Sequence, residues 1–214
     1  MATSTRFALP SENEIREWNN VTSINFKFSV LAPQYLSHAK DFTDDAVLSD
    51  LDSTLNRLSS LNGKLAFLYF NFPSAVGPKR ADAAIEFLGK IPNEFPLAVS
   101  FRNQKLAKNK SLYNSLAELN ISSVLVDNKS HHQTNLTLTN NNLLVHFHGL
   151  ESYNENKRAI EEWANKCSIC AESGIENIYF FATQQAPNKS QFPELLNEFK
   201  TALIDKLGTK AKFI

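Results

Sequence analysis

Two histidines, His146 and His148, lie two residues apart in the short apolar segment Val145-His146-Phe147-His148-Gly149. Successive side chains of a strand point to opposite faces, so both imidazoles would lie on one face. Two imidazoles and a carboxylate such as Asp127 could ligate a divalent metal. No glutamate or further histidine stands at the end of another apolar run. The sequence therefore favours a protein without a metal or any other cofactor.

Arg102 and Asp127 each close another apolar run, and they allow two interpretations. They could form a bidentate ion pair with each other, which would be purely structural. Alternatively, Arg102 could clamp an anion or a phosphate while Asp127 orients a histidine.

Two other pairs of residues are predicted to do no chemistry. Cys167 and Cys170 are the only cysteines, and they fall well inside a predicted helix. A redox pair needs its first cysteine at a helix N-terminus, and a zinc site needs further ligands. The two cysteines are therefore expected to be small residues of a buried helical stripe. His131 and His132 lie in a polar stretch and are expected to be solvated.

Alternating strand-like and helix-like segments must position these side chains. Apolar runs predict strands over residues 26–30, 65–72, 97–101, 123–126, 143–147 and 178–181. Capping residues and apolar spacings of three and four predict helices over residues 11–18, 43–63, 81–91, 111–119, 156–173 and 192–207. The strands are continuous apolar runs, as in a parallel sheet covered on both faces. Such a sheet is either doubly wound or closed into a barrel.

Composition excludes several classes of protein. Lys and Arg together number 22, as do Asp and Glu, so the net charge is zero and general nucleic-acid binding is disfavoured. Only six glycines are present, and none forms a phosphate-binding loop. No apolar run could cross a membrane or serve as a signal peptide, which predicts a cytoplasmic protein. No linker interrupts residues 1–214, so one domain is expected; the oligomeric state stays open.

Several short motifs, taken in order, resemble the YecE-like family, also called domain of unknown function 72. Residues 26–38 (FKFSVLAPQYLSH) resemble the family's third-strand region. Residues 68–73, 95–102, 145–149 and 178–181 are similar to its later strands, and residues 4–10 resemble the end of its second strand.

This resemblance implies an α/β fold of the TIM (β/α)8-barrel type, incomplete at the N-terminus because nothing corresponds to the family's first strand-helix unit. Two explanations stay open. Either the start is truncated or the gene degenerate, or the protein is an open barrel whose strand edges something must cover.

In such barrels the functional groups stand at the C-terminal ends of the strands. The resemblance places the family's Lys, Glu and Arg at Leu31, Ser100 and His146, so charge is lost at three positions. Polar character remains at the ligand-binding candidates Arg102, Asn71, Gln184 and His38, and at the catalytic candidates Asp127, His148 and His146.

Two functions are consistent with these residues. The first is a degenerate or ligand-binding member without a strong catalytic constellation, which binds at most a small anionic ligand or a partner. The second is a hydrolase-like barrel that acts on a phosphorylated or phosphodiester substrate, with or without a metal ion. The lost charges and the missing first unit favour the first.

Overall fold

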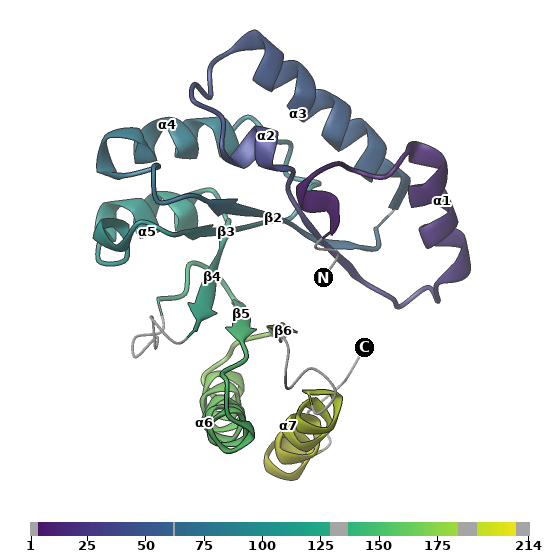
Figure 1. Ribbon diagram of the computed structural model, residues 1–214, viewed down its shortest axis with the longest axis vertical. Coiled ribbons are helices and arrows are strands. Elements are labelled where there is room, and N and C mark those ends of the chain that lie inside the picture. Colours follow the sequence, from purple (N-terminus) through teal and green to yellow (C-terminus); the bar gives the residue numbers. More distant parts are fainter. Residues whose placement is uncertain (1–3, 62, 129–136, 184–191, 209–214) are drawn as a thin grey trace. The chain divides into compact units, whose positions relative to one another are not determined.

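A computed structural model describes residues 4–61, 63–128, 137–183 and 192–208 of the chain (Figure 1). These residues form two compact units, which divide after Ser123. Each unit is described by itself below. The single domain expected over residues 1–214 stays a prediction.

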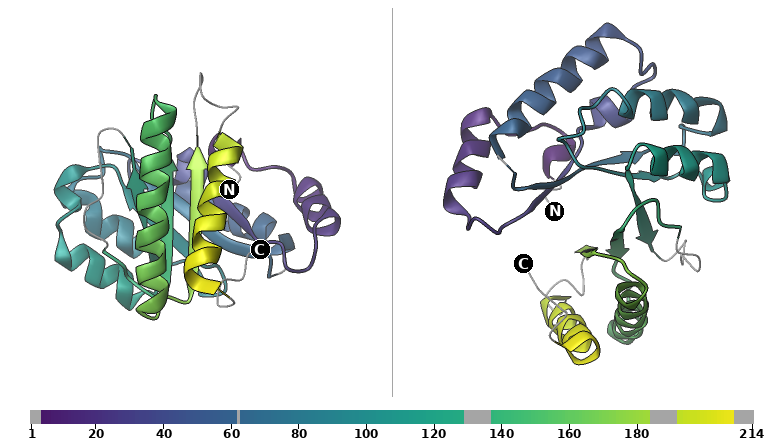
Figure 2. Two further views of the ribbon diagram at one scale, coloured as in Figure 1. Left: turned by 90° about the horizontal axis from the view of Figure 1, so that it is seen from below. Right: turned by 180° about the vertical axis from the view of Figure 1, so that it is seen from behind.

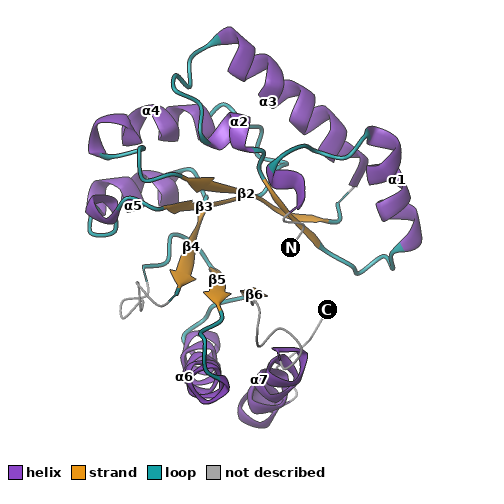
Figure 3. Cartoon of the chain, viewed as in Figure 1, coloured by secondary structure: helices purple, strands orange, loops and turns teal. Residues whose placement is uncertain are grey.

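Six parallel strands follow one another in chain order, each hydrogen-bonded to the next (Figure 3). This order confirms the predicted α/β class with a parallel sheet. The strands are β1 (Phe28–Leu31), β2 (Leu65–Phe72), β3 (Leu97–Phe101), β4 (Ser122–Asp127), β5 (Asn142–His148) and β6 (Asn177–Thr183).

The first unit contains β1 to β3, the start of β4 and five α-helices. These are α1 (Glu12–Val21), α2 (Gln34–Ser37), α3 (Asp45–Leu58), α4 (Pro78–Leu88) and α5 (Lys110–Glu118). Its core contains stacked and edge-on phenylalanine rings, such as Phe70 against Phe87 at 6.0 Å between centroids. Leu68, Phe70 and Phe72 of β2 all belong to this core. Because strand residues alternate, Phe67, Tyr69 and Asn71 point to the opposite face.

The second unit contains the rest of β4, then β5 and β6, with the helices α6 (Tyr153–Glu172) and α7 (Phe192–Leu207). The two helices pack side by side over the strands (Figure 2). Leu143, Val145 and Phe147 of β5 belong to the core beneath them. His146 and His148 therefore lie on the face of β5 that points away from the helices.

One expectation about the N-terminal part was wrong, and one element there was not predicted. Residues 4–6 form a single 3-10 turn, whereas the resemblance had implied a strand end over residues 4–10. Thr5 is fully buried, and its hydroxyl donates to the Leu31 carbonyl at 2.7 Å. This side-chain contact replaces backbone pairing. The short helix α2 was not predicted, because four residues are too few to show helical periodicity.

Candidate functional site

A row of neutral polar groups crosses from β2 to β3 in the first unit. The Tyr69 hydroxyl lies 2.7 Å from the Ser100 hydroxyl, which in turn donates to Oδ1 of Asn71 at 3.2 Å. Burial raises the pKa of Tyr69 to about 12, so the phenol stays neutral. Since a serine hydroxyl has one proton, Ser100 must accept from Tyr69. The row therefore fixes the Asn71 carbonyl and leaves its NH2 group available to a ligand.

Basic side chains lie near the C-terminal ends of β1 and β3. Gln34, with its amide oxygen turned toward Arg6, accepts from Nε and Nη2 of that arginine at 2.7 and 2.6 Å. Burial, followed by the charges of Arg6 and Arg102, lowers the pKa of His38. His38 is held by the Ser37 hydroxyl, 3.0 Å from its Nδ1. The guanidinium groups of Arg6 and Arg102 therefore both place positive charge near the His38 ring.

The guanidinium groups of Arg6 and Arg102 have no acidic counter-ion in the described part of the first unit. Arg6 is partly engaged by Gln34 and by the Phe7 ring, as Arg80 is by two backbone carbonyls and by the Phe42 ring. The Arg102 guanidinium has no such contact among the described residues, and Arg6 keeps its Nη1 donors for another group.

Arg6 and Gln34 were missed by the sequence interpretation. Arg6 fell in a segment assigned to a strand end, and Gln34 in a loop. The 27 residues between them, 7–33, carry no periodic signal that predicts their contact. Their position depends on the turn at residues 4–6 and on α2, the two elements that sequence patterns predicted wrongly or not at all.

The two histidines of β5 meet in the second unit, as their spacing predicts. Their ring centroids are 4.2 Å apart. His148 pairs in register with Thr183 of β6, whose hydroxyl lies 3.2 Å from Nδ1 of His148 and 3.4 Å from Nε2 of His146. Thr183 was noted as a strand end but was not chosen as a site residue. Only the register of β5 against β6 identifies it.

Burial keeps both imidazoles neutral near pH 7. It lowers the pKa of His146 to about 4, with a smaller contribution from His148. It also lowers the pKa of His148, although the Asp127 carboxylate acts in the opposite direction. The cluster thus offers uncharged ring nitrogens rather than positive charges.

Asp127 has a partner that the sequence did not reveal. Its Oδ2 accepts from the indole Nε1–H of Trp163 on α6 at 2.6 Å, and both side chains are buried. Asp127 and Leu125 share a face of β4, and Leu125 packs in the core beneath α6. The carboxylate therefore points toward the helices, whereas the two imidazoles point away from them. Its catalytic role stays a prediction.

The cysteine interpretation is confirmed. Cys167 and Cys170 are free thiols buried in α6. Burial raises the pKa of Cys167 to about 12 and also raises that of Cys170, so neither forms a reactive thiolate near neutral pH.

Other candidate groups can be placed only in part. Gln184, His131 and His132 lie outside the described residues. Over the described ranges, no group of three or more His, Cys, Asp or Glu side chains could hold a metal ion. None of the helices seen there is long and apolar enough to span a membrane.

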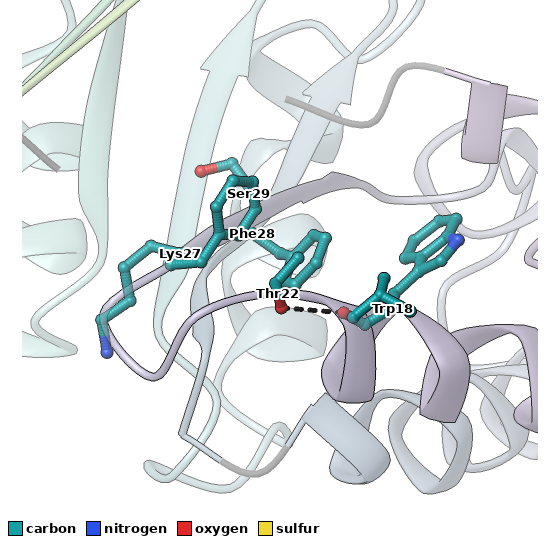
Figure 4. A pocket seen from close by; sticks show the side chains of 7 residues that line it. Trp18, Thr22, Lys27, Phe28 and Ser29 are labelled. Carbon is teal, nitrogen blue, oxygen red and sulfur yellow. Dashed lines mark hydrogen bonds between the residues drawn. The ribbon is translucent and has the colours of Figure 1, made fainter.

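A hollow of about 290 Å³ lies away from these polar groups, at the start of β1 (Figure 4). Its lining includes Trp18 of α1, the C-cap residue Thr22 and Phe28 of β1. The Trp18 and Phe28 rings stack at 5.7 Å. Because the hollow lies at the N-terminal end of β1, it does not coincide with the candidate ligand groups at the C-terminal strand ends.

Comparisons with known proteins agree on one family. The chain is 24% identical to the UPF0759 protein YecE of Escherichia coli K12 over 219 residues, which cover 91% of this chain and 78% of YecE.

Two solved structures of DUF72 family proteins share the fold. The protein of Enterococcus faecalis matches with a TM-score of 0.70 and 15% identity, over 99% of this chain and 84% of that one. The protein of Thermotoga maritima matches with a TM-score of 0.62 and 20% identity, over 89% of this chain and 81% of that one. Residues 3–212 match the family described as protein of unknown function DUF72. The chain therefore belongs to the DUF72 family, as the resemblance of its strand motifs had indicated.

Proposed function

We propose that the C-terminal strand ends of the first unit bind a small anionic ligand, a phosphate or a carboxylate, through Arg6, Arg102 and His38. The observation that carries this proposal is the pair of guanidinium groups with no carboxylate partner among the described residues of the first unit. Guanidinium groups recognise phosphate and carboxylate oxygens through paired N–H donors. An anion would supply the missing counter-charge.

Asn71 adds a neutral donor to this site. Its Oδ1 is held by Ser100, and Ser100 is held by the buried Tyr69, so the amide has a fixed orientation. A pre-oriented donor loses little side-chain entropy when a ligand binds. We assign Asn71 to the neutral, oxygen-bearing part of the ligand.

We further propose that the six strands belong to an incomplete barrel of the (β/α)8 type. The parallel strand order from β1 to β6 and the likeness to the DUF72 structure of Enterococcus faecalis support this proposal. In such barrels the C-terminal strand ends carry the binding groups. This placement agrees with the location of Arg102 directly after β3.

Replacing Arg102 with alanine is expected to weaken the binding of inorganic phosphate or citrate at least about tenfold, because a charge-assisted hydrogen bond contributes roughly 1.5–3 kcal/mol. Isothermal titration calorimetry at low ionic strength measures the change. Arg16→Ala is the matched control, since Arg16 is exposed and already pairs with Glu12 of the same helix. Equal affinities of wild type and Arg102→Ala would refute the proposal.

Anion binding is also expected to raise the pKa of His38. In the free protein, burial and the charges of Arg6 and Arg102 lower this pKa, because they disfavour the imidazolium. A bound anion offsets the two positive charges and favours protonation. NMR titration of the histidine ring protons, with and without saturating phosphate, measures the shift, and His38→Gln assigns the signal. An unchanged or lowered pKa would place the anion elsewhere.

A further inference from the structure

The His146–Thr183–His148 cluster of the second unit has the geometry of a chelating pair. The two histidines project from the same face of β5, and their rings lie 4.2 Å apart between centroids. Their nitrogens converge on one point, since Nε2 of His146 and Nδ1 of His148 both lie within 3.4 Å of the Thr183 hydroxyl oxygen. Two imidazole nitrogens that converge in this way can share one bound cation.

We propose that His146 and His148 together bind one transition-metal ion of the borderline class, such as Zn²⁺, Ni²⁺ or Cu²⁺. Imidazole nitrogen suits these ions, whereas Mg²⁺ and Ca²⁺ require several oxygen ligands. Thr183 supplies a single hydroxyl oxygen next to the two nitrogens. The sequence alone favoured a protein without a metal, because no glutamate or further histidine stands at the end of another predicted strand.

A carboxylate stands on the strand next to the cluster, because Asp127 of β4 pairs in register with Phe147 of β5. This carboxylate points to the other face of β4 and hydrogen-bonds Trp163, so it contributes an electrostatic field rather than a ligand.

The ligand set leaves coordination positions open. No third His, Cys, Asp or Glu side chain joins the pair among the described residues. Water or a substrate oxygen would complete the coordination, as at catalytic zinc sites, which keep an open position. Two protein ligands also imply weaker binding than a closed structural site. An ion held in this way could polarise a bound substrate.

Calorimetric titration of the full-length, chelator-treated protein with ZnCl2 tests the proposal. We expect one zinc ion per chain and at least about a tenfold loss of affinity in His148→Gln, because even the loss of an outer-shell partner costs that much at metal sites. Zinc should also raise the melting temperature of the wild type more than that of the variant. His148 is only half-buried, and circular dichroism checks that the variant folds.

Two controls separate this site from other histidines. His38→Gln, in the first unit, should bind zinc like the wild type. The double variant His131→Gln/His132→Gln should also retain the site. Unchanged affinity in His148→Gln, loss of binding in the His131/His132 variant, or absence of zinc binding by the folded wild type would each overturn the proposal.

Discussion

Replacing Lys64 with methionine is expected to lower the free energy of unfolding by about 3 kcal/mol, because it removes the charged donor to two carbonyls at the partly buried C-terminal end of α1. Lys64 is buried, and its Nζ lies 2.6 Å from the Asn19 carbonyl, 3.0 Å from the Thr22 carbonyl and 3.2 Å from the Thr22 hydroxyl. These acceptors form the C-terminal end of α1. No basic residue stands in the last turn of that helix.

The position of Lys64 also places a positive charge at the negative end of the helix dipole. Methionine keeps most of the side-chain volume and removes only the amine, so the expected loss measures the polar contacts. Urea denaturation followed by circular dichroism gives the free energy of unfolding.

Lys27→Met is the matched control for this experiment. Lys27 is exposed, and its amine donates to one carbonyl, that of Gly63, at 2.7 Å. Substitutions of exposed residues usually change stability by less than about 0.5 kcal/mol. If Lys64→Met lowered the free energy of unfolding no more than Lys27→Met does, the amine of Lys64 would not stabilise the end of α1.

The buried pair Asp127 and Trp163 is expected to show a coupling free energy of about 2 kcal/mol in a double-mutant cycle. Trp163→Phe removes the indole donor that lies 2.6 Å from Oδ2 of the carboxylate. Asp127→Ala removes the carboxylate acceptor of the buried Trp163 indole N–H. Each single substitution should therefore lower the free energy of unfolding by about 3 kcal/mol, and the double variant by clearly less than the sum.

Trp18→Phe is the control for the loss of an indole, since Trp18 contributes a ring stacked on Phe28. Trp18→Phe should lower the free energy of unfolding by only about 1 kcal/mol, because phenylalanine can keep the stacking on Phe28. Thermal and urea unfolding of the four proteins of the cycle measure the coupling. A coupling near zero would mean that the short contact does not hold β4 to α6, and Asp127 would again be available for a direct catalytic role.

Local patterns predicted most of the elements. The bounds of β2, β3 and α7 agree with the predicted ranges, because continuous apolar runs or helical spacings end there at polar or proline residues. The strand β1 begins two residues later than predicted. Phe26 still belongs to a turn, with its N–H bonded to the Ser23 carbonyl, and pairing begins where the Phe28 N–H meets the Lys64 carbonyl. Apolar residues alone do not show where backbone pairing starts.

The candidate site was predictable only where one element supplies it. The shared face of His146 and His148 follows from the two-residue repeat of a strand. The same repeat places Asp127 with Leu125, and this parity could have indicated that its carboxylate points toward the helices. The indole of Trp163, which holds that carboxylate, is 36 residues away in the sequence, within the helix predicted over residues 156–173.

The sequence by itself determined the order of strands and helices, the parallel α/β class, the buried position of the two cysteines and the common face of the two histidines. These properties depend on periodicity within single segments, which neighbouring residues set. The tertiary structure decided which side chains meet: Arg6 with Gln34, Lys64 with the end of α1, and Thr183 with both imidazoles. Such contacts depend on strand register and helix docking, and these follow from packing over a whole unit rather than from any one segment.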